Sequence, residues 1–206
     1  MPNLKSLFAV LAAAFIALPV FAADPENILV IEVAGETSGT IEIELLPEVA
    51  PKHVERVKRL ARDGIYDGIV FHRVIDEFMA QTGDVQHGKR EGFNLRYAGT
   101  GKSVFPNLPA EFSDIPYVKG TVGMARSQET DSGNSQFFIM FEDGGTVNGK
   151  YRSWGEVLNG QYTVFGKVIA GQDVVDSIKR GSSAANGAVA EPDYMETVRV
   201  KADVDG

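Results

Sequence analysis

The sequence contains no cysteine, one tryptophan and three histidines among its 206 residues. Without cysteine there is no disulfide bond and no thiolate ligand, and the histidines, His53, His72 and His87, do not share the spacing of a metal site. We therefore expect neither a metal nor a cofactor. Basic residues are also few, with 20 lysines and arginines against 28 aspartates and glutamates and a net charge of −8. No basic cluster is present, so neither nucleic acid nor an anionic membrane surface is an expected partner.

A long apolar run lies at the N-terminus. Residues 7–20 are apolar, follow the single charge of Lys5, and precede small residues that end at Ala22, where a signal peptidase would cleave. About 14 apolar residues are few for a helix that spans a membrane. We therefore interpret residues 1–22 as a cleaved secretory signal peptide and residues 23–206 as one soluble domain without stable membrane insertion. An uncleaved membrane anchor is the alternative.

The remaining chain is rich in strand patterns and turn residues. Residues 40–45 alternate apolar and acidic side chains, as a half-buried strand does. Seven further strands are predicted over residues 28–33, 69–74, 78–82, 121–125, 136–141, 163–168 and 196–201, and two helices over residues 47–62 and 172–179. Many strands with one early and one late helix indicate a mainly β fold, a closed barrel with helices over its ends. The long segments 84–107 and 142–156 are expected to be irregular surface excursions.

Two short stretches carry most of the chemical information. Residues 71–84 read Phe-His-Arg-Val-Ile-Asp-Glu-Phe-Met-Ala-Gln-Thr-Gly-Asp, and residues 123–126 and 135–139 read Gly-Met-Ala-Arg and Ser-Gln-Phe-Phe-Ile. Both place a few hydrogen-bonding residues among aromatic and thioether side chains, which is the composition of an apolar pocket with convergent polar groups. Strand alternation predicts that Gln136 and Phe138 face this pocket while Phe137 faces the core. His72, next to Arg73, is expected to point away from the pocket and to pack internally.

Together these stretches resemble the active-site signature of the cyclophilins, a family of peptidyl-prolyl cis-trans isomerases that binds cyclosporin. The resemblance covers residues 27–200 and implies a closed eight-stranded antiparallel barrel capped by two α-helices. It also implies isomerisation of X–Pro bonds in extended peptides, without cofactor or covalent intermediate. Arg73 stands where the family has its catalytic arginine. The positions implied to bind substrate are Phe78, Met79, Gln81, Ala125, Arg126, Gln136, Phe138, Leu158 and Tyr162.

This chemistry needs neither a nucleophile nor a metal, because the barrier of ~18–20 kcal/mol arises from amide resonance. A thousandfold acceleration requires about 4 kcal/mol. One charge-assisted hydrogen bond contributes roughly 1.5–3 kcal/mol, and a dry pocket that holds the twisted amide adds to it. The guanidinium of Arg73 can donate that hydrogen bond toward the prolyl nitrogen, because it is always charged.

Three positions depart from the pattern of eukaryotic members. Arg126 stands where many have an asparagine, and Tyr162 stands where they have a pocket histidine. Val157 aligns with the tryptophan that is linked to strong cyclosporin binding, so we expect weak binding of cyclosporin. Trp154 lies three residues earlier, and a local shift of the alignment would restore the tryptophan.

We therefore predict a monomeric periplasmic isomerase that acts on proline-containing unfolded or flexible polypeptides during the folding of exported proteins. An alternative from another class is a periplasmic peptide-binding chaperone that uses the same pocket with little turnover. A third is a degenerate barrel with a purely structural role. The presence of Arg73 favours the enzyme, since a binder has less need of a charge aimed at the prolyl nitrogen. The two long segments favour the chaperone, since they can widen the binding surface.

Overall fold

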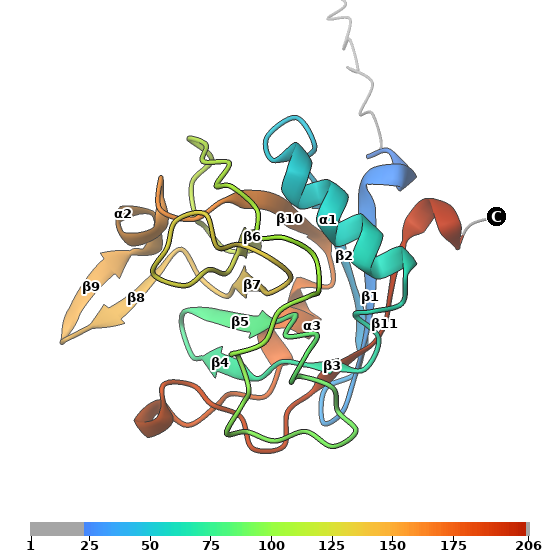
Figure 1. The fold of residues 1–206 in the computed structure, drawn as a ribbon. Coiled ribbons are helices and arrows are strands. Elements are labelled where there is room, and N and C mark those ends of the chain that lie inside the picture. Colours follow the sequence, from blue (N-terminus) through green and yellow to red (C-terminus); the bar gives the residue numbers. More distant parts are fainter. Residues whose placement is uncertain (1–22, 205–206) are drawn as a thin grey trace, which may run out of the picture.

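The computed structural model describes residues 23–204, so the predicted signal peptide, residues 1–22, lies outside the described part. Its main feature is a strongly curled antiparallel sheet of nine strands in the order β3-β11-β1-β2-β10-β6-β7-β5-β4 (Figure 1). The strands are β1 Ile28–Ala34, β2 Gly39–Leu45, β3 Ile69–Val70, β4 Arg73–Ile75, β5 Met79–Thr82, β6 Thr121–Met124, β7 Phe137–Met140, β10 Val164–Ala170 and β11 Tyr194–Val200.

The helices are few and short. They are α1 Pro51–Arg62, α2 Trp154–Leu158 and α3 Gln172–Ser177, with single 3₁₀ turns at Pro25–Asn27, Ser183–Ala185 and Lys201–Asp203. Helix α1 packs against β11 and β10, and α3 packs against β2. Within residues 23–204, no helix combines the length and the apolar character that crossing a bilayer requires.

The strand count corrects the expectation of a closed eight-stranded barrel. All eight predicted strands are present, but the segment predicted as one strand over residues 69–74 is divided at Phe71 and His72 into β3 and β4. These two halves lie at opposite edges of the sheet, and no pairing between them joins the edges in the described chain. The reason is a pair of long-range backbone hydrogen bonds: Phe71 N–H donates to the Asp193 carbonyl, and the His72 carbonyl accepts from Val189 N–H. The backbone at this corner thus bonds to the 181–193 segment.

The predicted helices also need correction. The first begins at Pro51 and not at residue 47, because Val49 and Ala50 N–H close a turn on the Leu46 carbonyl, and proline suits the first helical position. The segment 142–156 is not irregular. It forms a hairpin of β8 Gly144–Val147 and β9 Lys150–Ser153 and leads into α2, so the described chain has three α-helices where two were expected. Figure 1 shows this hairpin projecting from the body of the molecule.

Apolar side chains form two separate clusters. The larger fills the curled sheet and contains the inward row of β2, Ile41, Ile43 and Leu45, together with one face of α1. The smaller consists of Met79, Tyr117, Phe138, Met140, Trp154, Leu158 and Val164. Phe137 belongs to the first cluster and Phe138 to the second, which confirms the predicted alternation along β7.

The corner residue His72 is buried, as expected, with 3% of its surface exposed. Neither ring nitrogen has a hydrogen-bond partner among the described residues. Burial, aided by the neighbouring Arg73, lowers the pKa of His72 from 6.5 to about 4 against the opposing effect of Asp84. The ring is therefore neutral in the folded protein at neutral pH.

This burial predicts a pH-dependent stability. The unfolded chain binds a proton at His72 near pH 6.5 and the folded chain only near pH 4, so stability is present above 6.5 and falls as the pH drops toward 4. His72 should account for about 3 kcal/mol of that loss, at 1.36 kcal/mol per pH unit. Urea unfolding between pH 7 and pH 4.5 should show a shallower slope in His72→Asn than in the wild type. His87→Gln is the control and should keep the slope; an unchanged slope in His72→Asn contradicts the prediction.

Candidate functional site

The sheet aligns four positions in one row. Arg73 on β4 is opposite Gln81 on β5, Gln81 is opposite Phe138 on β7, and Phe138 is opposite Gly123 on β6. A side chain at Gly123 would collide with the rings of Tyr117 and Phe138, so glycine is what allows these rings to lie over β6. The strand register therefore sets a cation, an amide and an aromatic ring side by side.

The guanidinium of Arg73 is held from two sides. Its Nε donates to the Asn186 carbonyl and Nη2 to Asn186 Oδ1, both at 3.1 Å, while Nη1 donates to Gln81 Oε1 at 3.1 Å. No carboxylate of the described residues forms an ion pair with it. Burial lowers the pKa of Arg73 from its usual value, yet a guanidinium remains charged in proteins. Three of its five N–H groups are used, which leaves two for a ligand.

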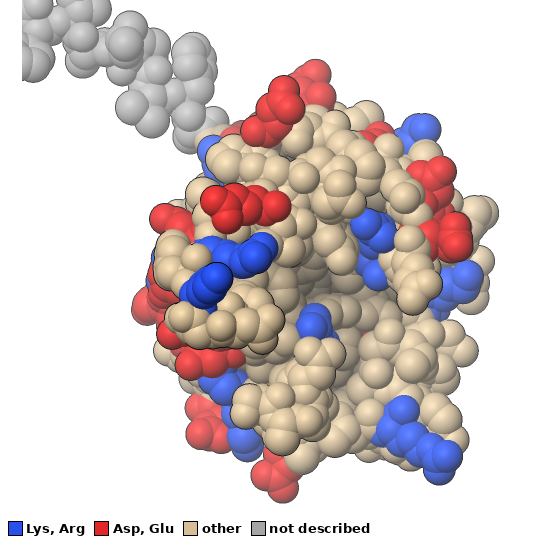
Figure 2. Space-filling view, turned by 90° about the vertical axis from the view of Figure 1, so that its left-hand side faces the viewer, with Lys and Arg blue, Asp and Glu red and all other residues tan. Residues whose placement is uncertain are grey.

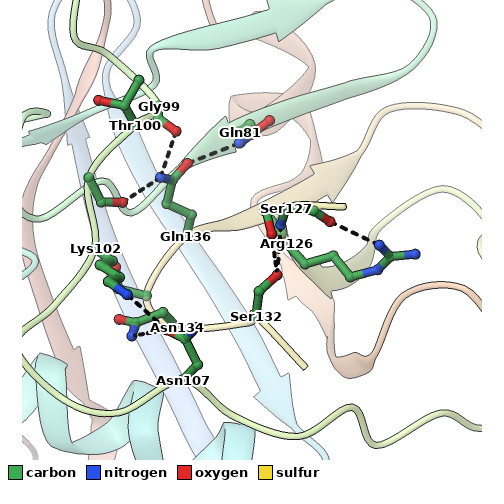
Figure 3. Close-up of a pocket in the computed structure, with 13 residues that line it drawn as sticks. Gln81, Gly99, Thr100, Lys102, Asn107, Arg126, Ser127, Ser132, Asn134 and Gln136 are labelled. Carbon is green, nitrogen blue, oxygen red and sulfur yellow. Dashed lines mark hydrogen bonds between the residues drawn. The ribbon is translucent and has the colours of Figure 1, made fainter. Parts of the chain in front are cut away.

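The hydrogen bonds continue from Gln81 into a neighbouring loop. Gln81 Nε2 donates to Gln136 Oε1 at 3.0 Å, and Gln136 Nε2 donates to the carbonyls of Gly99 and Gly101 at 3.0 and 2.7 Å (Figure 3). A single chain of hydrogen bonds thus runs from Asn186 through Arg73, Gln81 and Gln136 to the 84–107 segment. The predicted polar site residues are brought together, and Gln136 is oriented by this segment.

The 84–107 segment is built into the site and is more than a surface excursion. Asp84, fully buried, accepts the backbone N–H groups of Gln86, His87, Gly99 and Gly101. One carboxylate therefore ties the start of the segment to residues fifteen and seventeen positions later. The sequence offers a signal for this in the glycines at 99 and 101, which give the backbone room to approach; a side chain at Gly101 would collide with Asp84.

The apolar site residues belong to one packed cluster. The ring of Phe138 lies edge-on to Tyr162 at 5.8 Å and stacks on Tyr117 at 5.7 Å between centroids. Met79 and Leu158 are buried in the same cluster, and Phe78, Ala125 and Tyr162 pack against it partly exposed. All the apolar residues that the sequence suggested thus meet, although their individual roles stay predictions. The sequence reading missed Tyr117 and Asn186, which lie outside the two signature stretches.

Arg126 borders the pocket from the other side. Its guanidinium lies 4.6 Å from the centroid of the Tyr162 ring, within range of a cation–π interaction. Nε donates to the Gln161 carbonyl, and Nη1 donates to the carbonyls of Ser127 and Gln128. Two cations therefore flank the pocket, Arg73 and Arg126, and each is fixed by neutral acceptors.

Trp154 occupies the pocket wall in space, although Val157 aligns with the tryptophan position in sequence. Its ring lies 4.3 Å from that of Phe78, and its Nε1 donates to the Glu77 carbonyl at 2.8 Å. Only 8% of Trp154 is exposed, compared with 42% of Val157. The β8–β9 hairpin, inserted before α2, turns the chain so that Trp154 begins the helix beside Phe78.

Two cavities near the hydrogen bonds of Gln81 and Gln136 share Gln81 and Gly99 in their linings. The first has a volume of 320 Å³ and is lined by Gln81, Gly99, Thr100, Gly101, Lys102, Asn107, Ala125, Arg126, Ser127, Ser132, Asn134, Ser135 and Gln136. The second has a volume of 270 Å³ and is lined by His72, Arg73, Gln81, Leu95, Ala98, Gly99, Ala185, Asn186 and Ala188. The molecular surface is hollowed on the face that carries the β8–β9 hairpin (Figure 2). The arrangement fits an extended peptide, with an apolar ring in the pocket and backbone or side chains in the cavities.

Comparison with known proteins gives consistent matches. The family model for cyclophilin type peptidyl-prolyl cis-trans isomerase matches residues 28–200. A probable peptidyl-prolyl cis-trans isomerase of Brucella suis is 52% identical over 202 residues, which cover 95% of this chain and 96% of that protein. Peptidyl-prolyl cis-trans isomerase B of Bacillus subtilis is 37% identical over 122 residues, 59% of this chain and 78% of that protein.

Solved structures show the same fold at lower identity. The cyclophilin AquaCyp293 of Hirschia baltica aligns with a TM-score of 0.67 and 24% identity, covering 88% of this chain and 76% of that one. A cyclophilin type peptidyl-prolyl cis-trans isomerase of Cryptosporidium parvum, crystallised in the presence of the dipeptide Ala-Pro, aligns with a TM-score of 0.64 and 23% identity, covering 84% and 98%.

The anchoring by Asp84 predicts a local effect of removing its charge. Asp84→Asn should lower the free energy of unfolding by about 2–4 kcal/mol, because charge-assisted hydrogen bonds to several N–H groups are weakened in a buried site. Hydrogen exchange at the amides of Gly99 and Gly101 should accelerate. Asp131→Asn is the control, since that exposed carboxylate accepts only Ala110 N–H. Equal protection of Gly99 and Gly101 in wild type and Asp84→Asn would refute the anchoring role.

Proposed function

The chain belongs to the cyclophilin-type peptidyl-prolyl cis-trans isomerases, and we propose that it serves the folding of exported proteins. It is a rotamase that acts on proline-containing peptides. X–Pro bonds exchange in tens to hundreds of seconds without catalysis, which is slow enough to limit folding. A newly exported chain with several such bonds therefore gains from an isomerase at its point of arrival.

The observation that carries the mechanism is the fixed guanidinium of Arg73 beside an apolar pocket. A proline ring in the pocket made by Phe138, Met79 and Leu158 places the prolyl nitrogen next to a charged donor whose orientation is already set by Gln81 and Asn186. As the amide twists, the lone pair localises on that nitrogen and accepts a hydrogen bond from Arg73. The bond strengthens only in the twisted state, so it lowers the barrier without stabilising the ground state equally.

The periplasmic destination rests on the predicted signal peptide. Residues 1–22 have the charge, the apolar run and the small residues of an export signal, and the acidic remainder of the chain suits a soluble exported domain. Mass spectrometry of the protein from a periplasmic extract should give a mature chain that begins at Ala23. A full-length chain recovered with the membranes would support the uncleaved anchor instead.

Two further expectations belong to the proposal. We expect weak binding of cyclosporin. The indole N–H of Trp154 donates to the Glu77 carbonyl, so this donor is not available for a hydrogen bond to a ligand. Titration of the isomerase activity with cyclosporin tests this expectation, and strong inhibition would contradict it. We also expect a monomer, which light scattering of the purified protein decides.

The chaperone alternative gains one supporting observation. The 84–107 segment contributes exposed apolar side chains near the site, with Leu95 40% and Tyr97 50% exposed, and these can hold an unfolded chain. The two functions are separated by removing the catalytic cation. Suppression of aggregation that persists in Arg73→Ala would show a holding activity that is independent of turnover.

Replacing Arg73 tests the mechanism directly. Arg73→Ala should lower kcat/KM for exchange of an Ala-Pro bond in a short peptide at least tenfold, because a charge-assisted hydrogen bond of about 1.5–3 kcal/mol is lost in the transition state. Arg73→Lys should recover part of the activity through its charge, though without the planar fork. The rate of cis-trans exchange is measured by NMR. Circular dichroism verifies that each variant is folded. Wild-type protein without acceleration, or Arg73→Ala with full activity, contradicts the mechanism.

Asn186 should act as a positioning residue for Arg73. It has a left-handed backbone with a φ of 52°, so Asn186→Gly keeps the backbone conformation and the carbonyl acceptor but removes Oδ1. We expect kcat to fall about threefold to tenfold with little change in KM, since one hydrogen bond that orients the cation is lost. Asn186→Asp retains an acceptor and should recover kcat. Equal losses in both variants would indicate a merely structural role.

A further inference from the structure

Lysines and arginines divide into two groups by their partners. Some form ion pairs, as in Lys167–Glu44, Arg199–Asp67 and Lys201–Glu42, whereas others, such as Lys89 and Arg90, donate only to neutral acceptors among the described residues. Five cations near the site form none with any residue from 23 to 204, and we call them the site-face cations: Arg73, Lys102, Arg126, Lys150 and Arg152. The chain carries a net charge of −8, and the Glu77 carboxylate contacts the hairpin backbone at Thr146, yet none of these five cations pairs with a carboxylate of residues 23–204.

The site-face cations surround the places that a peptide would occupy. Lys102 and Arg126 line the 320 Å³ cavity from different segments, and Arg73 lines the 270 Å³ cavity (Figure 3). Neither cavity has an aspartate or glutamate in its lining. Figure 2 shows Lys and Arg side chains in and beside the hollow of this face, while most Asp and Glu side chains lie toward the outline of the molecule.

The β8–β9 hairpin extends this charge beyond the proline pocket. It is held against the Phe78 side of the site. Trp154 directly follows β9, and its ring lies 4.3 Å from that of Phe78 at an angle of 37°, while Thr146 N–H donates to the Glu77 carboxylate. Lys150 and Arg152 are exposed on β9 and alternate with Tyr151, which is 71% exposed. At about 3.3 Å per residue, these cations lie roughly 7–13 Å along the strand from Trp154, the length of two to four extended substrate residues.

We propose that the site face selects polypeptide segments that carry acidic residues near the proline. The proline occupies the apolar pocket, and carboxylates about two to four residues away contact Lys150 and Arg152 on the hairpin, the spacing that strand geometry sets. The proposal rests on the isomerase function and names its substrate class. Nucleic acid and anionic membranes fit less well, since the cations ring a hollow in a molecule whose overall negative charge repels an extended polyanion.

The test uses three peptides that share an Ala-Pro core. They carry glutamate, glutamine or lysine about two to four residues from the proline on both flanks. For the wild type, kcat/KM on the glutamate peptide should exceed that on the glutamine peptide about threefold to tenfold, with the lysine peptide lowest. The difference should shrink at about 0.5 M salt, because exposed charges are screened. Equal kcat/KM for the three peptides overturns the proposal.

A pair of charge-reversal variants locates the effect. Lys150→Glu with Arg152→Glu should abolish the glutamate preference and leave exchange of the glutamine peptide unchanged, since neither residue belongs to the proline pocket. Lys167→Glu with Lys179→Glu changes the net charge by the same amount away from the site and should keep the preference. Loss of the preference in this control as well would mean a general charge effect, which contradicts the hairpin contact.

The outcome also separates the proposal from the function on which it rests. Absence of exchange with the glutamine peptide would contradict the isomerase mechanism. The dissociation constants of the same three peptides, measured by fluorescence anisotropy, then decide the charge preference on their own. Tighter binding of the glutamate peptide that depends on Lys150 and Arg152 supports it, and equal dissociation constants overturn it. Equally strong binding of the protein to vesicles of anionic phospholipid, lost in the hairpin variant, would assign the cations to a membrane surface instead.

Discussion

The site depends on one cation that is fixed without being neutralised. Arg73 is held by Asn186 and Gln81, both neutral, through three hydrogen bonds of 3.1 Å. A carboxylate would have fixed the guanidinium more strongly, but it would also have offset the charge that the twisted amide needs. Neutral acceptors orient the donor and leave its charge available, which is the requirement for electrostatic preorganisation. Because this charge is partly buried, neighbouring segments must supply the hydrogen bonds that compensate its lost contact with water. The surrounding structure provides these acceptors.

The curled sheet supplies the support by joining segments that are distant in the sequence. The division of residues 69–74 at Phe71 and His72 places β4 at the sheet edge, where the 181–193 segment bonds to the corner and brings Asn186 to Arg73. On the other side, Gln136 connects the row of strands to the 84–107 segment, which Asp84 ties down. Both loops are therefore part of the same hydrogen-bonded unit as Arg73, the proposed catalytic residue.

Local patterns predicted the strands well because each is a short alternating or apolar run with turn residues at its ends. They also predicted which ring of the Phe137–Phe138 pair faces the site. What they did not predict depends on partners far along the chain. The break at His72 is caused by bonds to residues 189 and 193, and the order of the 84–107 segment is caused by a single carboxylate that reaches Gly99 and Gly101. The contact between the Trp154 and Phe78 rings was not predicted either, because a hairpin that the sequence did not indicate sets the position of Trp154.

The same constraint that governs Arg73 extends to the face around it. Arg126 is anchored by three backbone carbonyls and the ring of Tyr162, again without a carboxylate, and the cations on β9 are likewise unpaired. An acidic residue placed near these groups would compete with the substrate for their charge and, in a low-dielectric hollow, would weaken the field at the prolyl nitrogen. The lack of ion pairs at these described cations suits the proposed catalytic role of Arg73, and it is also what the proposed preference for acidic substrate segments requires. Specificity and catalysis at this site then have one electrostatic origin.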